Sequence, residues 1–188
     1  MSTNLPIPKR LFSVSEYLRM AETGLISEEE CVELIEGEII KLAPKTPLHA
    51  SNIDRISDLL IRRLPEQVIT WVPNPIHLND YSLRQPDITI LRPKENFYED
   101  AHPTPTDIFW LIEVADTSLD YDKKVKLPLY ARSGVQEVWL VNLPKSRIEV
   151  YCRPFDDIYQ EIRLLHKEQT LVINSFPEIS FLVSELLG

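Results

Sequence analysis

A single glutamate interrupts a strongly apolar run of this chain. Residues 109–115 read Phe-Trp-Leu-Ile-Glu-Val-Ala, so Glu113 stands where a strand covered on both faces normally carries an apolar side chain. An ionised side chain that loses water there costs several kcal/mol unless it is paired, hydrogen-bonded or bound to a metal. Asp87, which follows Pro86 at the start of the β-rich run 87–91, repeats this pattern. Both carboxylates are therefore candidates for a functional site.

The alternation of side chains along a strand indicates how these two carboxylates lie. It places Asp87, Thr89 and Leu91 on one face of the first strand, and the odd-numbered residues of 109–115, Phe109 and Glu113 among them, on one face of the second. If the two strands are neighbours, the carboxylates lie a few ångströms apart. Two anions at that separation repel each other, and a divalent cation between them is the usual remedy.

The rest of the chain predicts an α/β fold. A capping box of Ser13 and Glu16 predicts a helix that ends near Gly24, and Glu36-Gly37 predicts the turn of a β-hairpin over 31–42. Further expected elements are a helix over 49–64, strands over 68–72, 109–114 and 138–141, a helix within 119–133, an antiparallel extension at 147–152 and 161–165, and a closing helix over 176–187. A strand, a helix and a strand in that order form a βαβ unit and hence a partly parallel sheet.

Pro128 disturbs the helix expected within 119–133. Inside a helix, proline removes one hydrogen bond and crowds the carbonyl four residues earlier, here that of Lys124. Either the helix bends at Pro128 or its regular part begins near Leu127. The second alternative places Lys126 at the start of the helix, where an amine is well placed to serve a site.

Composition narrows the class of protein. A length of 188 residues favours a single domain over 1–188, and no run approaches the roughly 20 apolar residues that a membrane span needs. No signal segment is apparent, and Cys31 and Cys152 are too few for a disulfide framework, so we expect a cytoplasmic protein without a membrane partner. Four glycines exclude glycine-rich phosphate loops, and the scattered histidines make a zinc hydrolase a poor fit.

Several of these motifs together resemble a known family. Pro86-Asp87, Glu113-Val114 and Lys126 resemble the PD-(D/E)XK nuclease superfamily. The chain from Leu11 to Asn142 is more closely similar to the Uma-two family, whose members are described as putative restriction endonucleases, and the residues that carry this similarity are Glu33-Leu-Ile-Glu-Gly-Glu38, Pro86-Asp-Ile88, Ile112-Glu-Val114, Asp122-x-x-x-Lys126, Tyr130 and Gly134-Val-x-Glu-x-Trp139. The resemblance implies a restriction-endonuclease-like mixed β-sheet flanked by α-helices, with an N-terminal helix and β-hairpin.

The resemblance also implies a catalytic set. Asp87 and Glu113 would hold the metal, the carbonyl of Val114 would be a third ligand, and Lys126 would act on the attacking water. The simplest superfamily motif, Glu-x-Lys, puts lysine at position 115, where this chain has Ala115; in the Uma-two family the lysine lies in the following helix, which matches Lys126. Because all proposed ligands are oxygens, Mg²⁺ is the expected metal, with Mn²⁺ as an alternative.

Four further residues are secondary candidates, each with two readings. Asp122 lies one helical turn before Lys126, and it either simply pairs with the amine or holds it in place for the site. Glu33 is an outer ligand of metal or water, or a member of a salt bridge. His49 belongs to the site, as the family suggests, or to the surface. Tyr130 is a hydrogen bonder of the site or a core residue.

The sequence leaves three functions open. The first is a Mg²⁺-dependent endonuclease of DNA, for which a homodimer is the expectation of the class, since nucleases acting on duplexes often work as symmetric dimers. The second is a catalytically silent binding or regulatory module with the same fold, which a net charge of −9 favours because it repels nucleic acid at long range. The third, a nuclease of RNA or branched DNA, would use the same residues as the first.

Overall fold

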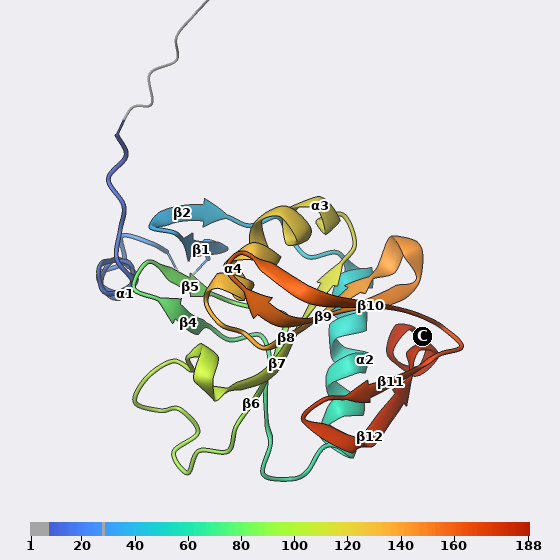
Figure 1. Ribbon diagram of the computed structural model, residues 1–188. Helices are drawn as coiled ribbons and strands as arrows, with labels where there is room; N and C mark the ends of the chain where they lie inside the picture. The colour runs from blue at the N-terminus through green and yellow to red at the C-terminus, as the bar shows by residue number, and fades with distance from the viewer. Residues whose placement is uncertain (1–7, 28) are drawn as a thin grey trace, which may run out of the picture.

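A six-stranded mixed sheet forms the centre of the protein, with helices on both faces (Figure 1). The computed structural model describes residues 8–27 and 29–188. The order of strands in the central sheet is β10-β9-β8-β7-β6-β3, and a four-stranded sheet of order β2-β1-β5-β4 lies beside it. The elements are α1 (Val14–Glu22), β1 (Val32–Ile35), β2 (Glu38–Lys41), α2 (Pro47–Arg63), β3 (Ile69–Trp71), β4 (Ile76–Asn79), β5 (Ser82–Arg84), β6 (Ile88–Leu91), η1 (Pro105–Asp107), β7 (Ile108–Ala115), α3 (Leu119–Tyr121), η2 (Asp122–Lys126), α4 (Leu127–Arg132), β8 (Glu137–Asn142), η3 (Leu143–Lys145), β9 (Arg147–Phe155), β10 (Ile158–His166), β11 (Thr170–Ile173), β12 (Phe176–Leu182) and α5 (Val183–Leu187).

The N-terminal helix and hairpin form as predicted. The side chain of Ser13 accepts from the backbone N–H of Glu16, whose carboxylate accepts from the backbone N–H of Ser13. Gly37 adopts a φ of +81°, and a β-carbon there would lie 2.5 Å from Cβ of Leu11, so the turn requires glycine. Strand β1 of this hairpin also pairs with β5, which connects it to a segment about fifty residues later in the chain.

The central strands carry the predicted βαβ unit. Strands β7 and β8 are parallel, with Ile112 opposite Trp139, and β6 pairs antiparallel with β7, with Ile88 opposite Ile112. Helix α2 packs on one face, while α4 packs on the other. Trp110 and Trp139 stack at a centroid separation of 5.2 Å within the core on the α2 face, as expected for buried tryptophans. No helix among the described residues has the length and apolar character to cross a membrane.

One expectation about the faces of β7 is wrong. Phe109 does not share a face with Leu111, because the register of β6 and β7 shifts between Ile90 and Leu91. This irregularity places Ile108 in the core of the α4 face with Leu111, whereas Phe109 packs edge-on against Phe176 on the opposite side. The alternation holds beyond the irregularity, so Leu111 and Glu113 still share the α4 face.

The closing helix expected over 176–187 is also wrong for most of its length. Phe176–Leu182 is strand β12, paired with β11, and the helix α5 covers only Val183–Leu187. Ile179 and Phe181 face inward while their neighbours are exposed, which is the period of two that a half-buried strand requires. An apolar run of this length does not separate helix from strand by composition alone.

The segment around Pro128 follows the second alternative. Helix α4 begins at Leu127 with Pro128 in its first turn, where the fixed φ of proline suits the helix. A π-helical turn over Asp122–Lys126 precedes it, and the N–H of Leu127 bonds back to the carbonyl of Asp122. Lys126 therefore lies directly before the regular helix, on a π-helical turn of the kind often found at functional sites.

Candidate functional site

A cavity of about 360 Å³ opens between the loop that precedes α2 and the segment that follows β7. Of the residues predicted from the sequence, five line this cavity: Glu33, His49, Asp87, Glu113 and Lys126. Asp122 and Tyr130 do not line it but contact Lys126 and Glu113 from behind. The backbone N–H of Val114 bonds to Asp87. The structure thus brings all eight predicted residues into one place.

Glu113 is the centre of this cluster. It is 2% exposed on the central strand β7, and its Oε2 accepts a hydrogen bond from Nζ of Lys126 at 2.8 Å. The hydroxyl of Tyr130 donates to Oε1, and a guanidinium nitrogen of Arg84 lies 3.8 Å from the same oxygen. Burial alone would raise the pKa of the Glu113 carboxyl, but Lys126 and Arg84 outweigh it and lower that pKa. Glu113 is therefore held as a carboxylate.

Lys126 lies between two carboxylates. Its Nζ is 2.7 Å from Oδ1 of Asp122 and 2.8 Å from Oε2 of Glu113, and Ser118 donates to the other oxygen of Asp122 at 2.6 Å. Burial would lower the pKa of Lys126, but Glu113 and Asp122 raise it above its ordinary value. Asp122 therefore forms the ion pair with the amine that the first of its two readings expects. The amine is positively charged at any physiological pH.

Asp87 is bound by groups from a different part of the chain. Lys45 donates to Oδ1 at 3.0 Å, and Nε2 of His49 lies 3.0 Å from Oδ2. The backbone N–H of Val114 also donates to Oδ2, at 2.9 Å, and ties Asp87 to the strand that carries Glu113. Burial and the nearby charge of Glu113 raise the pKa of the Asp87 carboxyl, which Lys126 and Lys45 oppose.

Arg84 and Lys45 are the two residues of the cluster that the sequence did not predict. Arg84 is 1% exposed, forms an ion pair with Glu33 across the β1–β5 pair, and approaches Glu113. The second reading of Glu33, a salt bridge, is therefore present, although burial still raises the pKa of its carboxyl more than Arg84 lowers it. No sequence signal marks Arg84, because its neighbours Ser82 and Gln85 are polar and do not predict a buried segment.

Carboxyl groups outnumber cations in the buried part of the cluster. The buried or nearly buried members are the carboxyl groups of Glu33, Asp87, Glu113 and Asp122 and the cations of Arg84 and Lys126, and the more exposed Lys45 supplies one further cation. Burial raises the pKa values of Glu33, Asp87 and Asp122, so the charged forms of these three groups are disfavoured. A bound cation would stabilise those charged forms.

The donor set fits Mg²⁺ in one specific way. Among the described residues, no three or more His, Cys, Asp or Glu side chains are arranged to hold a metal by themselves. Mg²⁺ commonly keeps several waters and takes only one or two carboxylates together with phosphate oxygens of a substrate. Asp87 and Glu113, joined through the N–H of Val114 and lining one cavity, meet that lower requirement.

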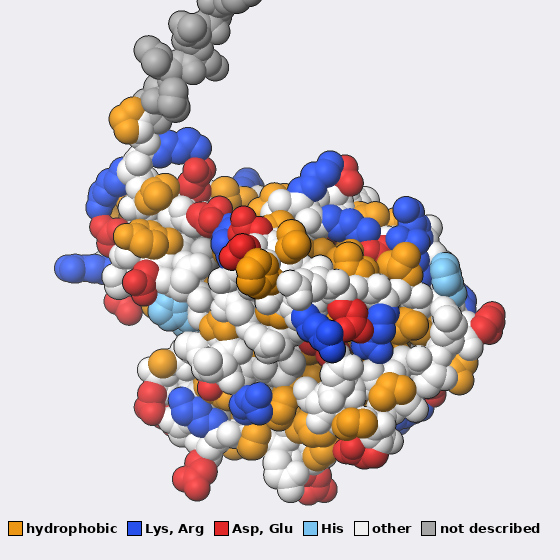
Figure 2. Space-filling view, in the orientation of Figure 1, with side chains coloured by type: hydrophobic (Ala, Val, Ile, Leu, Met, Phe, Trp, Pro, Cys, Tyr) orange, Lys and Arg blue, Asp and Glu red, His pale blue; other side chains and the backbone are white. Residues whose placement is uncertain are grey.

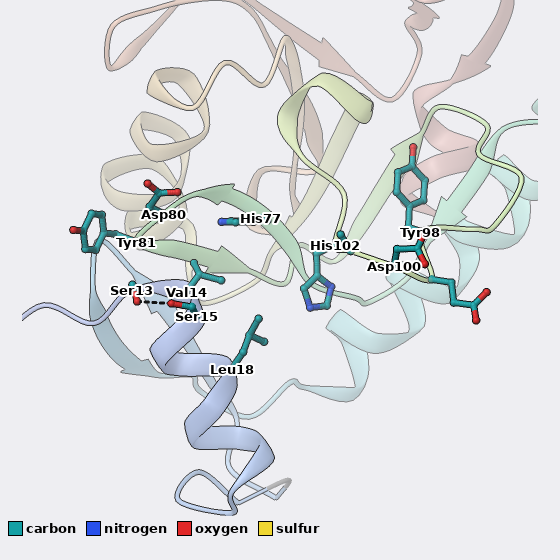
Figure 3. A pocket seen from close by; sticks show the side chains of 12 residues that line it. Ser13, Val14, Ser15, Leu18, His77, Asp80, Tyr81, Tyr98, Asp100 and His102 are labelled. Atoms are coloured by element: carbon teal, nitrogen blue, oxygen red, sulfur yellow. Dashed lines mark hydrogen bonds between the residues drawn. The ribbon is translucent and has the colours of Figure 1, made fainter.

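A larger cavity of about 660 Å³ lies between α1 and the loop that carries residues 98–102 (Figure 3). Its polar side chains are spread out rather than gathered: Asp80 lies at one end and Asp100 at the other, with His77 and His102 between them. Burial and the neighbouring His77 lower the pKa of His102. The charged side chains at the smaller cavity contact one another, whereas those of the larger cavity are spread out, so the smaller cavity is the better candidate for a site.

Comparisons with known proteins agree with the predicted fold and family. A family model described as "Putative restriction endonuclease", Uma2, matches residues 14–184. The crystal structure of a "putative nuclease belonging to DUF820" from Anabaena variabilis is similar to this chain, with a TM-score of 0.68 and 18% sequence identity, and the match covers 94% of this chain and 97% of that one. No curated protein matches the chain. The structural similarity confirms the restriction-endonuclease-like mixed sheet expected from the sequence.

Proposed function

This chain belongs to the Uma2 family of putative restriction endonucleases, and from that membership we propose that it is a metal-dependent endonuclease that hydrolyses phosphodiester bonds of DNA. The observation that carries the proposal is that two carboxylates and one charged amine line a single cavity. Asp87 directly precedes β6, Glu113 lies on the neighbouring strand β7, and Lys126 lies in η2. Burying so many ionisable groups together costs free energy, and clusters of this kind are concentrated at functional sites.

Asp87 and Glu113 would hold Mg²⁺ or Mn²⁺, and the carbonyl of Val114 is the proposed third ligand. When bound, the ion would polarise a phosphoryl oxygen and lower the pKa of a nearby water. The remaining contributions come from the chain itself. Tyr130 and Arg84 keep the carboxylate of Glu113 oriented and ionised through contacts at its Oε1.

Lys126 acts as a charged donor in this proposal. Because Glu113 and Asp122 raise the pKa of its amine, Lys126 does not serve as a base that removes a proton from water. It instead donates a hydrogen bond that orients the attacking water, or it stabilises the negative charge that develops on the phosphorus oxygens. Asp122, fixed by Ser118, holds the amine in that position.

A catalytically silent binding or regulatory module is the second candidate. The net charge of −9 favours it, since an acidic protein repels nucleic acid at long range. The face of the described residues seen in Figure 2 carries basic and acidic side chains interspersed, with no continuous basic stripe. Such a module would keep the fold and lose metal binding or hydrolysis.

Metal titration and plasmid nicking separate the two candidates. Calorimetry with Mg²⁺ and Mn²⁺ should detect binding to the wild type and to Asp58→Asn, whose carboxylate is exposed, but not to Asp87→Asn. Nicking should require the metal and be lost in Asp87→Asn and Glu113→Gln. Metal binding without hydrolysis of DNA, RNA or branched DNA would favour the silent module. Nicking that persists in both site variants would contradict the proposed site.

A further inference from the structure

Two lysines contact the carboxylates of the site, and they are held very differently. The side chain of Lys126 is 15% exposed and lies between two carboxylates. The side chain of Lys45 is 42% exposed, and Asp87 is the one carboxylate that it contacts among the described residues. Ion pairs that involve an exposed lysine are weak and exchange readily, since water competes for the ammonium. Lys126 is therefore fixed in the site, whereas another cation can replace the ammonium of Lys45 at Asp87.

The loop around Lys45 allows its side chain to move without moving the backbone. Residues 42–46 have no regular structure and join β2 to α2. Thr46 anchors the end of this loop, because its hydroxyl caps α2 by accepting from the N–H of His49 at 3.1 Å and donates to Asp116 at 2.9 Å. The four-carbon stem of Lys45 reaches into the cavity from this fixed point. His49, which belongs to the rigid helix, has no comparable freedom.

We propose that Lys45 is a placeholder cation for the metal and a phosphate-binding residue once the metal is bound. This inference rests on the proposed function. In the metal-free protein, the ammonium of Lys45 neutralises Asp87, which is buried and lies near the charge of Glu113. A divalent cation held by Asp87 would bring two positive charges and would displace the ammonium of Lys45 from this carboxylate. The released amine then lies at the mouth of the cavity, where it binds a phosphate of the nucleic acid.

This role has two consequences of opposite sign. Removing the charge of Lys45 removes a competitor for Asp87, so the metal should bind more tightly. The same change removes a phosphate contact, so the metal-loaded protein should bind nucleic acid more weakly. A lysine that only stabilises the fold would not give this pair of effects.

The experiment compares the wild type with Lys45→Met and Lys41→Met. Lys41 lines the same cavity and makes no ion pair with the described residues, so its variant controls for the loss of one charge. Calorimetry with Mn²⁺ measures metal affinity. Fluorescence anisotropy measures the binding of a short DNA duplex with phosphorothioate linkages, which resist hydrolysis, with and without Mn²⁺. Circular dichroism confirms that each variant is folded.

For Lys45→Met we expect Mn²⁺ to bind about three- to tenfold more tightly than to the wild type. We expect the duplex to bind about three- to tenfold more weakly in the metal-loaded state, with the salt slope reduced by about one, and no change in the metal-free state. Lys41→Met should retain wild-type metal affinity. Equal or weaker metal binding by Lys45→Met would overturn the inference.

The outcomes also separate this inference from the proposed function. If the wild type binds metal and nicks plasmid while Lys45→Met binds metal no more tightly, the nuclease proposal stands and the placeholder role is wrong. If the wild type binds no metal and Lys45→Met does, the placeholder role is supported, because the lysine then blocks the site. If neither protein binds metal, the placeholder role is wrong, and so is the proposal that the nuclease depends on a metal.

Discussion

Lys123 and Lys126 leave the same π-helical turn and bind carboxylates on two different strands. Lys126 contacts Glu113 on β7, and Lys123 lies 2.6 Å from Glu149 on β9. Leu140 on the intervening strand β8 is opposite both glutamates, so the three residues form one row across the sheet. The turn is therefore fixed to the sheet on both sides of Leu140, which explains how a short irregular segment positions an amine.

The first prediction concerns the amine itself. Lys126→Met should lower the initial rate of plasmid nicking by 10²-fold or more, the range found when a charged or polar donor to a transition state is removed. Lys124→Met is the matched control, because Lys124 is two residues away and pairs only with the exposed Asp120 among the described residues. It should leave the rate unchanged. Similar rates for both variants would mean that the amine of Lys126 takes no part in the reaction.

The second prediction concerns the buried arginine. Arg84→Met leaves Glu33 without its buried partner and removes one of the cations beside Glu113, which should lower the free energy of unfolding by about 3–5 kcal/mol. Urea denaturation followed by circular dichroism measures this change. Arg62→Met should lower it by less than about 1 kcal/mol, because Arg62 pairs on the surface with Asp58. A loss in Arg84→Met as small as that in Arg62→Met would show that the ion pair with Glu33 is not needed for stability.

The third prediction concerns the hydroxyl of Tyr130. This group is one of the contacts that lower the pKa of Glu113, so Tyr130→Phe should raise that pKa. A carboxylate that protonates more easily loses its charge at higher pH. In a plot of nicking rate against pH, the acidic limb should therefore move to higher pH. In Tyr17→Phe, which loses a hydroxyl bonded to the carbonyl of Val32, the limb should stay in place. An unshifted limb in Tyr130→Phe would argue against Glu113 as the titrating group.

The site was predictable from sequence where a charge stands alone in a strand. Glu113 and Asp87 are predicted as candidate site residues because each breaks an apolar pattern. The family motif then links them to Lys126. The contacts of Tyr130 and Asp122 follow once the helix after β7 is known, since both residues lie near Lys126 along the chain. These relationships depend on local periodicity, which a sequence records directly.

The missed parts depend on contacts between distant segments. Arg84 meets Glu33 because β1 and β5 pair in one particular register, which neither strand specifies alone. Lys45 reaches Asp87 from a loop without any periodic pattern. The strand Phe176–Leu182 forms because β11 offers it a partner, and its apolar residues fit a helix equally well on composition. Tertiary pairing decided each of these cases.

The last prediction starts from the five donors around Glu149. Its side chain is 1% exposed and accepts from Lys123, Tyr151, both guanidinium donors of Arg147 and the amide of Asn142. Burial alone would raise the pKa of this carboxyl, but the hydrogen bonds from Lys123, Tyr151 and Arg147 lower it from 4.5 to about 2. The group therefore binds its proton more weakly in the folded chain than in the unfolded chain.

A carboxyl whose pKa falls on folding stabilises the protein only while it is ionised. The contribution of Glu149 is therefore complete above its unfolded pKa of about 4.5 and is lost as the pH falls toward about 2, and on the order of 2–3 kcal/mol is at stake. Urea denaturation of the wild type and of Glu149→Gln between pH 2.5 and 6 measures this, because glutamine does not titrate. The variant should be less stable at pH 6, and the difference should shrink steadily as the pH falls. Glu178→Gln, at an exposed position, should follow the wild-type curve throughout. A constant difference between the wild type and Glu149→Gln would mean that the stabilising effect of Glu149 does not depend on its charge.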